Sequence, residues 1–185
     1  MTVEEALAEP GRKVQASRDG DDGHRVVTIY GLSSGGAKEL AATSVSTAEH
    51  DALVATLRQR GCESADTELL TRVVWIINPS GVEVFDRRCK QLDAAVDRAT
   101  LRDGRIVERA DIAQVFAWAS DRYAHRGIKA TLKSGKDVEL VTAISLSATG
   151  DPTYNRNDLL FDSGWCVTLG RAIAKWAGTE FEDRV

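Results

Sequence analysis

The segment from Asp162 to Ala177 constrains the fold most, because it is apolar along one side at helical spacing. This predicted face is made of Trp165, Leu169, Ala172, Ile173 and Trp176. Asp162 or Ser163 can cap the first turn, and Gly178 follows the last apolar residue, where a left-handed residue ends a helix at little cost. Burial of side chains this large contributes roughly 1.5–3 kcal/mol each. We therefore predict a helix over 163–177 that closes a hydrophobic core.

Composition places the chain among ordinary globular proteins. Of its 185 residues, 43% are hydrophobic and 28% are charged. The net charge of −4 argues against bulk binding of nucleic acid. No run approaches the ~18 apolar residues of a membrane-spanning helix, and the N-terminus carries acids where a signal peptide has basic residues. Three Cys without a CxxC pattern fit a reducing compartment. We expect a cytoplasmic protein without a transmembrane segment, a nucleic-acid partner or a cofactor.

The first part of the chain predicts a strand meander followed by a helix. Residues 1–11 are expected to be a flexible tail or a short polar helix. Three apolar runs, at 13–17, 25–32 and 38–45, are separated by the Gly-containing turns 19–23 and 33–36, which is typical of antiparallel hairpins. Ser46 and Glu49 match a capping box, so a helix is expected over 46–60. The face of this helix is formed by His50, Leu53, Val54 and Leu57.

Residues 63–185 are expected to form a larger half that shares one compact unit with 12–62. Thr71–Asp86 is predicted as a hairpin with its turn at 78–81. The spacing of apolar residues then favours a helix over 86–98. Further hairpins are predicted around Asp103–Gly104 and 133–136, and an Asx-rich loop over 149–158. Segment 110–119 fits either a helix or a buried strand, and its alanines favour the helix.

The predicted fold class is therefore α+β. An antiparallel, hairpin-rich sheet would carry amphipathic helices at 46–60, 86–98 and 163–177, packed on one face or end. One short sequence repeat suggests two related βββα-like halves: the pattern LxSGxxxEL occurs at Leu32–Leu40 and again at Leu132–Leu140. A duplication would explain this repeat, and so would chance, because a Ser-Gly hairpin tip has few forms.

No motif in the sequence predicts a catalytic or metal site. The three histidines, His24, His50 and His125, lack the spacing of a zinc site, and His50 is interpreted as a hydrogen-bonded histidine at the edge of a helix face. The acidic cluster Asp19–His24 lacks calcium-loop spacing and is interpreted as a solvated turn. Cys166, expected in the first turn of a helix, has no neighbouring His. The sequence therefore assigns no catalytic residue, no metal ligand and no cofactor.

A basic run is the only charge pattern above background. It comprises Arg122, Arg126, Lys129, Lys133 and Lys136, with no acidic residue between Arg122 and Lys136. These side chains would form a surface that binds anions if they converge. The favoured alternative is a solvated hairpin whose lysines protect an edge strand from aggregation.

Residues from about 99 to 177 resemble the pleckstrin-homology-like family, including its bacterial members. The resemblance lies in the order of elements: the hairpins RATLR/RIVER and GIKATL/VELVTAISL, followed by the Trp-containing helix WCVTLGRAIAKWAG. It implies a barrel closed by that helix, for which segment 110–119 would have to be a strand. It also implies that basic loop residues, here Lys129, Lys133 and Lys136, bind phosphorylated headgroups.

The function predicted from these observations is a non-catalytic module that binds a protein partner or a second copy of itself. One alternative is binding of an anion or lipid headgroup through the Arg122–Lys136 hairpin. The other alternative is an enzyme whose residues are dispersed beyond the reach of local motifs.

Overall fold

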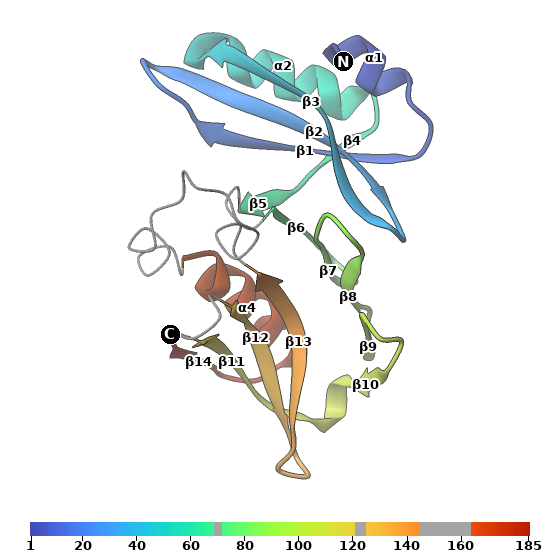
Figure 1. Cartoon of the computed structure of the whole chain (residues 1–185), viewed down its shortest axis with the longest axis vertical. Helices are drawn as coiled ribbons and strands as arrows, with labels where there is room; N and C mark the ends of the chain where they lie inside the picture. The colour runs from blue at the N-terminus through green and yellow to red at the C-terminus, as the bar shows by residue number, and fades with distance from the viewer. Residues whose placement is uncertain (69–71, 121–124, 145–163) are drawn as a thin grey trace.

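The computed structural model describes residues 1–68, 72–120, 125–144 and 164–185. These residues form fourteen β-strands in three sheets and three α-helices (Figure 1). About 54% of the described residues are in strands and 23% in helices, so the fold is dominated by its sheets. The predicted α+β class, with several amphipathic helices packed on one sheet, is wrong.

The N-terminal sheet, sheet A, has the strand order β3-β2-β1-β4. A two-residue turn at Ser34–Gly35 joins β2 to β3, and β4 returns parallel to β1 after a helix. Helices α1 and α2 contact the same sheet and share an apolar cluster with it. The bounds are α1 Val3–Ala8, β1 Arg12–Asp19, β2 His24–Ser33, β3 Gly36–Ser46, α2 Thr47–Gln59 and β4 Cys62–Ser64. The capping box of Ser46 and Glu49 is present at the start of α2.

The middle sheet, sheet B, is an antiparallel meander in which each strand pairs with the next. Its strands are β5 Asp66–Glu68, β6 Val73–Asn78, β7 Gly81–Phe85, β8 Lys90–Ala94, β9 Arg98–Leu101 and β10 Ile106–Glu108. The predicted hairpin over 71–86 is β6 and β7. A short 3-10 turn, Arg109–Asp111, leads out of this sheet.

The C-terminal sheet, sheet C, has the order β13-β12-β11-β14. Its elements are β11 Ile112–Ser120, β12 His125–Leu132, β13 Asp137–Ile144, the helix α4 Gly164–Ala177, and β14 Phe181–Arg184. Strand β14 runs parallel to β11, as β4 does to β1. Sheets A and C therefore have the same topology. Each is a three-stranded antiparallel meander, and the strand that follows the next helix pairs parallel with the first strand of the meander. A register shift leaves Leu40 unpaired in β3 and Leu140 unpaired in β13.

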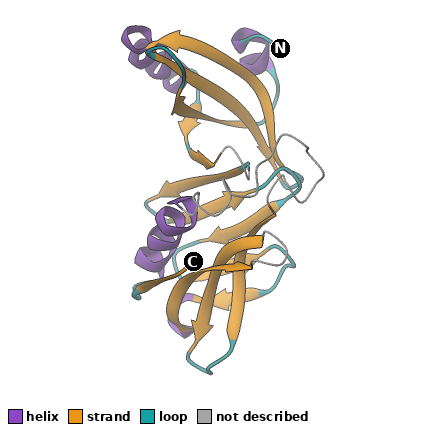
Figure 2. Ribbon diagram, turned by 60° about the vertical axis from the view of Figure 1, so that its left-hand side comes forward, coloured by secondary structure: helices purple, strands orange, loops and turns teal. Residues whose placement is uncertain are grey.

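Sheet B is the middle layer of the molecule (Figure 2). One of its faces packs on sheet A through a cluster that includes Val14, Tyr30, Ile76 and Phe85. Its other side shares the largest apolar cluster with α4 and sheet C. The N-terminal sheet with α1 and α2 thus forms one end of the elongated molecule, and sheet C forms the other (Figure 1).

The helix predicted over 86–98 is wrong, and segment 110–119, left open between a helix and a buried strand with the helix favoured, is a strand. The segment 86–98 contains β8, because the Asp86 carboxylate accepts the backbone N–H of Arg88 and Cys89 and so holds a turn there. The segment 110–119 lies mostly in β11, which has a hydrogen-bonded strand on each side. Pairing with two distant strands outweighs the weak helix propensity of its alanines.

The C-terminal helix is confirmed, with Trp165, Leu169 and Ile173 almost fully buried. Ala172 and Trp176, assigned to the same face, are only half-buried, although the Trp176 indole N–H donates to the Ala95 carbonyl. Gly178 follows the helix at φ +74°. The proposed caps, Asp162 and Ser163, and the Asx-rich loop 149–158 lie outside the described residues.

Candidate functional site

His50 contacts two residues that the sequence did not connect with it. Its Nε2 lies 2.9 Å from the Ser17 hydroxyl on β1, and its Nδ1 lies 2.8 Å from a carboxylate oxygen of Asp51. A Ser, a His and an Asp are thus joined in the order of a hydrolase triad. Ser17 is 33 residues from His50, so only the packing of α2 on sheet A reveals the contact.

This arrangement satisfies a buried imidazole but does not build a catalytic site. The Asp51 side chain is 96% exposed, so water competes for the hydrogen bond that would orient the histidine. Ser17 lies within strand β1, opposite Val27, and it lines neither of the two cavities described below. The interpretation of His50 as a hydrogen-bonded histidine agrees with these contacts.

All three cysteines lie among the described residues, and the pKa values of two of them, Cys62 and Cys89, are raised, which disfavours the nucleophilic thiolate. Burial raises the pKa of the Cys62 thiol, and burial together with the nearby Asp86 carboxylate raises the pKa of Cys89. Within residues 1–68, 72–120, 125–144 and 164–185, no three His, Cys, Asp or Glu side chains are grouped to hold a metal ion. In the same ranges, no helix is both long and apolar enough to cross a membrane.

The predicted anion-binding residues lie in different environments. Arg126 is 7% exposed, and Lys129 places its ammonium 4.1 Å from the centre of the Trp118 ring. Lys133 and Lys136 are exposed near the β12–β13 turn, and Arg122 lies outside the described residues. Lys129 is therefore engaged in a cation–π contact within the sheet. Anion binding by these five residues stays a prediction.

One charged cavity lies at the junction of sheets A and B. Its volume is about 300 Å³, and it is lined by Arg12, Leu32, Ser33, Ser34, Glu83, Phe85 and Lys90. Arg12 forms two hydrogen bonds with Glu63, at 2.9 and 2.6 Å, and a third with Glu83, at 2.8 Å. Lys90 lies 2.9 Å from Glu83 and 2.7 Å from Asp93. Both cations of this cavity already have carboxylate partners. The ion pairs therefore connect the two sheets, and the cavity offers no free positive charge to an anion.

Glu83 is the central charge of this junction. Burial disfavours its ionised form, but hydrogen bonds from Lys90 and Arg12 outweigh that effect and hold the pKa of Glu83 below its ordinary value. A depressed carboxyl pKa contributes stability that is present above the unfolded-state pKa, ~4.3 for Glu, and is lost as pH falls through the folded-state pKa.

We expect Glu83→Gln to lower the free energy of unfolding by about 1–3 kcal/mol at pH 7, because hydrogen bonds to charged groups contribute about that much. The difference between the variant and the wild type should stay constant above about pH 5 and shrink below about pH 4. Urea denaturation between pH 7 and pH 3 measures both quantities. Glu108→Gln, at an exposed position of β10, is the control. If the difference in unfolding free energy does not change with pH, the lowered pKa of Glu83 does not contribute to stability.

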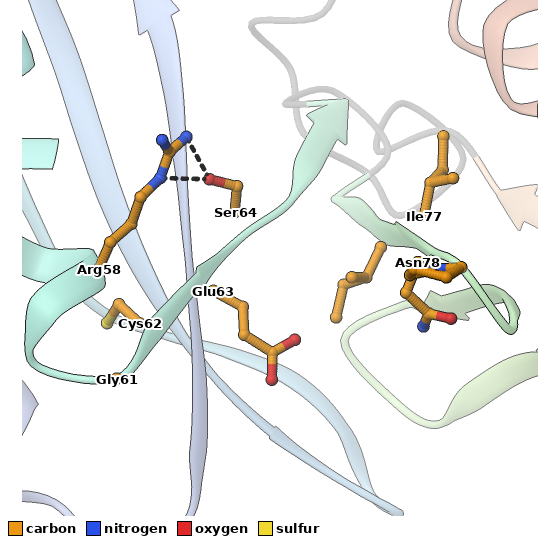
Figure 3. A pocket seen from close by; sticks show the side chains of 9 residues that line it. Arg58, Gly61, Cys62, Glu63, Ser64, Ile77 and Asn78 are labelled. Atoms are coloured by element: carbon orange, nitrogen blue, oxygen red, sulfur yellow. Dashed lines mark hydrogen bonds between the residues drawn. The ribbon is translucent and has the colours of Figure 1, made fainter. Parts of the chain in front are cut away.

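A second cavity lies where the chain passes from sheet A to sheet B (Figure 3). Strand β4 pairs with β1 through Ser64, and from Asp66 the chain pairs with β6 instead. Beyond Trp75, strand β6 continues to Asn78, and there β7 is its only partner within the described part of the chain. Two strand edges therefore diverge, and we call the space between 62–64 and 76–78 the β4–β6 fork. Its cavity of about 480 Å³ is lined by Arg58, Gly61, Cys62, Glu63, Ser64, Ile76, Ile77, Asn78 and Pro79.

The two sides of the fork differ in chemistry. On the β6 side, Ile77 is 56% exposed and is followed by the exposed Pro79. On the β4 side, Arg58 donates to the Ser64 hydroxyl oxygen from Nε at 3.0 Å and from Nη2 at 2.7 Å. Arg58 forms no ion pair within the described residues, whereas the neighbouring Glu63 is paired with Arg12. The fork therefore combines an apolar wall with an uncompensated positive charge.

Sequence reasoning missed the fork entirely. Lys13 and Cys62, which pair in β1 and β4, are far apart in the chain, and no local pattern predicts a parallel contact of three residues. The one local signal was Ile77, the exposed last residue of the apolar run VVWII in the predicted hairpin over 71–86.

No known protein family matches the chain, and no relative was found among curated proteins. The resemblance of residues 99–177 to pleckstrin-homology-like domains stays a prediction. The candidate site therefore rests on its own geometry.

Proposed function

We propose that the protein is a non-catalytic interaction module that binds an extended segment of a protein partner in the β4–β6 fork. The observation that carries the proposal is the meeting, among the described residues, of an unpaired strand edge, an exposed apolar wall and an Arg58 without an ion pair in one cavity. An extended segment that joins a free edge gains backbone hydrogen bonds, and the side chains beside the edge select its sequence.

The chemistry of the fork defines the segment that fits it. Strand β4 lies at the edge of sheet A, and β1 is its only partner among the described strands, so its outer backbone groups can pair with an added strand. Ile77 and Pro79 favour an apolar side chain in that segment. Arg58 favours a carboxylate, which would receive charge-assisted hydrogen bonds. The expected ligand is therefore an extended peptide that carries an apolar residue and an acidic residue.

Selection from a library of random displayed peptides, followed by fluorescence anisotropy of the selected peptides, tests the proposal. We expect enrichment of acidic residues next to apolar ones. Arg58→Glu should weaken binding by about 10- to 100-fold, because losing a hydrogen-bonded charge pair costs roughly 1.5–3 kcal/mol. Ile77→Lys, which changes an exposed side chain, should also weaken binding.

Arg18→Glu is the matched control, because it reverses an exposed charge on β1 outside the fork. Its affinity for the selected peptides should equal that of the wild type. If the peptides bind Arg58→Glu and Ile77→Lys as tightly as the wild type, the fork is not their site. A library that yields no binder to the folded protein would contradict recognition of linear segments.

A further inference from the structure

Strand β3 (Gly36–Ser46) is the free edge of sheet A on the side opposite the fork. Within the part of the chain that the structure describes, its only strand partner is β2. Its first half carries the usual protection of an edge, namely the charged pair Lys38 and Glu39 and the register shift at Leu40. The run from Leu40 to Ser46, LAATSVS, has no charged residue and no proline. A long neutral edge of this kind is a template for pairing with another strand.

The other outer strands are shorter, charged or occupied. Strand β14 is four residues long and includes Glu182, Asp183 and Arg184. Strand β10 has three residues and ends at Glu108. The edge of β13 is occupied at Thr142, where the backbone carbonyl accepts a hydrogen bond from the Gln91 side chain at 3.0 Å. Among these described outer strands, β3 therefore differs in both length and charge.

The backbone of β3 is available along this run. Near its start, the Ala37 N–H points away from β2 and donates to the Asp86 carbonyl at 2.6 Å. Between residues 38 and 45, no backbone hydrogen bond to any described element other than β2 is present. The side chains of Ala42 and Ser44 are exposed, whereas Ala41 packs toward the helices. Among the described residues, no backbone hydrogen bond between residues 38 and 45 other than those to β2 therefore has to break when a second strand pairs here.

We propose that β3 pairs antiparallel with β3 of a second copy of the chain, centred on Thr43, so that the two A sheets form one continuous sheet. In this register, Ala42 of one copy faces Ser44 of the other, and Ala41 faces Val45. Like charges directly opposite each other destabilise a strand pair, and this register places none opposite each other. The contact uses the same patch on both copies, so it closes as a dimer and does not propagate into a fibre. The fork lies at the opposite edge of sheet A and stays free.

Sedimentation velocity over a concentration series tests this dimer. We expect the wild type to pass from monomer to dimer as its concentration rises. Ala42→Lys/Ser44→Lys places lysines opposite lysines twice in the dimer, while both side chains stay exposed in the monomer. This variant should raise the dissociation constant by at least about tenfold. Ala52→Lys/Ala55→Lys adds the same charge at exposed positions of α2 and should leave the dimer unchanged.

A second double variant tests the register. Ala42→Lys/Ser44→Glu places a lysine opposite a glutamate in the proposed pairing, so dimerisation should return. Hydrogen exchange adds a backbone measurement, because amides at the edge should be protected at high concentration and not at low concentration. A wild type that stays monomeric, or a dimer that Ala42→Lys/Ser44→Lys does not weaken, overturns the proposal. Failure of the lysine–glutamate variant to dimerise overturns the pairing centred on Thr43.

Discussion

Replacing Gly81 with alanine is expected to destabilise the protein by at least about 3 kcal/mol, because a backbone atom occupies the space that the methyl group needs. A Cβ built on Gly81 would lie 1.6 Å from the carbonyl oxygen of Ala94 in the adjacent strand β8. Real Cβ contacts are essentially never shorter than 3.0 Å, so β7 and β8 must separate by more than an ångström. That movement would break the pairing of Val82 with Ala94 in the middle sheet.

Urea denaturation followed by circular dichroism measures this loss. Gly35→Ala is the matched control, because Gly35 also lies in a hairpin turn and its added Cβ would meet only an ordinary contact at 3.6 Å. The control should be neutral or stabilising by up to about 1 kcal/mol, since alanine restricts the unfolded chain. A Gly81→Ala variant within about 1 kcal/mol of the wild type would show that β7 and β8 can move apart freely.

Gly81 also shows what local sequence reasoning can and cannot find. The pattern NPSG predicted a turn at the correct place, because Pro and Gly restrict the local backbone in known ways. The same reasoning could not find the close approach of Ala94, which belongs to the next strand. The hairpin tips at Ser34–Gly35 and Ser134–Gly135 were likewise predicted correctly from local chemistry.

The errors arose where distant pairing decides the structure. Segment 110–119 has the alanines of a helix, but β12 and β14 flank it as strands, and β14 comes from the end of the chain. Segment 86–98 has apolar residues at helical spacing, but the Asp86 carboxylate fixes a turn at its start. Local propensity is a weak preference that tertiary contacts override. The fork and the free edge of β3 depend on strand order, which no local pattern in this sequence shows.

The two proposed surfaces follow from one property of sheet A. Its order, β3-β2-β1-β4, leaves a different strand at each edge without an outer partner among the strands that the structure describes. Strand β4 borders a cavity lined by Arg58, which has no ion pair among the described residues, so its edge suits a charged segment of another protein. Strand β3 carries no charged residue between Leu40 and Ser46, so its edge suits an identical strand. Binding of a peptide at β4 and pairing of two copies through β3 can occur at once, because the two strands lie at opposite edges of the sheet.

Asp86 joins the three sheets, and we expect Asp86→Ala to lower the free energy of unfolding by about 3–5 kcal/mol. This residue is 5% exposed, and its backbone carbonyl accepts the N–H of Ala37 in sheet A. Its carboxylate accepts the N–H groups of Arg88 and Cys89, at 2.7 and 2.8 Å, and the Gln91 amide at 2.6 Å. The same Gln91 amide donates to Thr142 in sheet C at 3.0 Å. Alanine would remove the acceptor of all three donors, of which the buried Gln91 amide would be left without a partner at this position, and an unsatisfied buried group costs its desolvation.

Chemical denaturation tests whether Asp86 connects the sheets through Gln91 or only holds the local turn. It compares four proteins: the wild type, Asp86→Ala, Gln91→Ala and the double variant. If Asp86 acts on sheet C through Gln91, the second substitution should cost much less once the first is present, with a coupling of about 1 kcal/mol or more. Asp103→Ala is the control, because Asp103 holds a similar turn with Arg105 at an exposed site and should cause a much smaller loss. Additive effects of the Asp86 and Gln91 substitutions would mean that the turn and the contact with sheet C are independent.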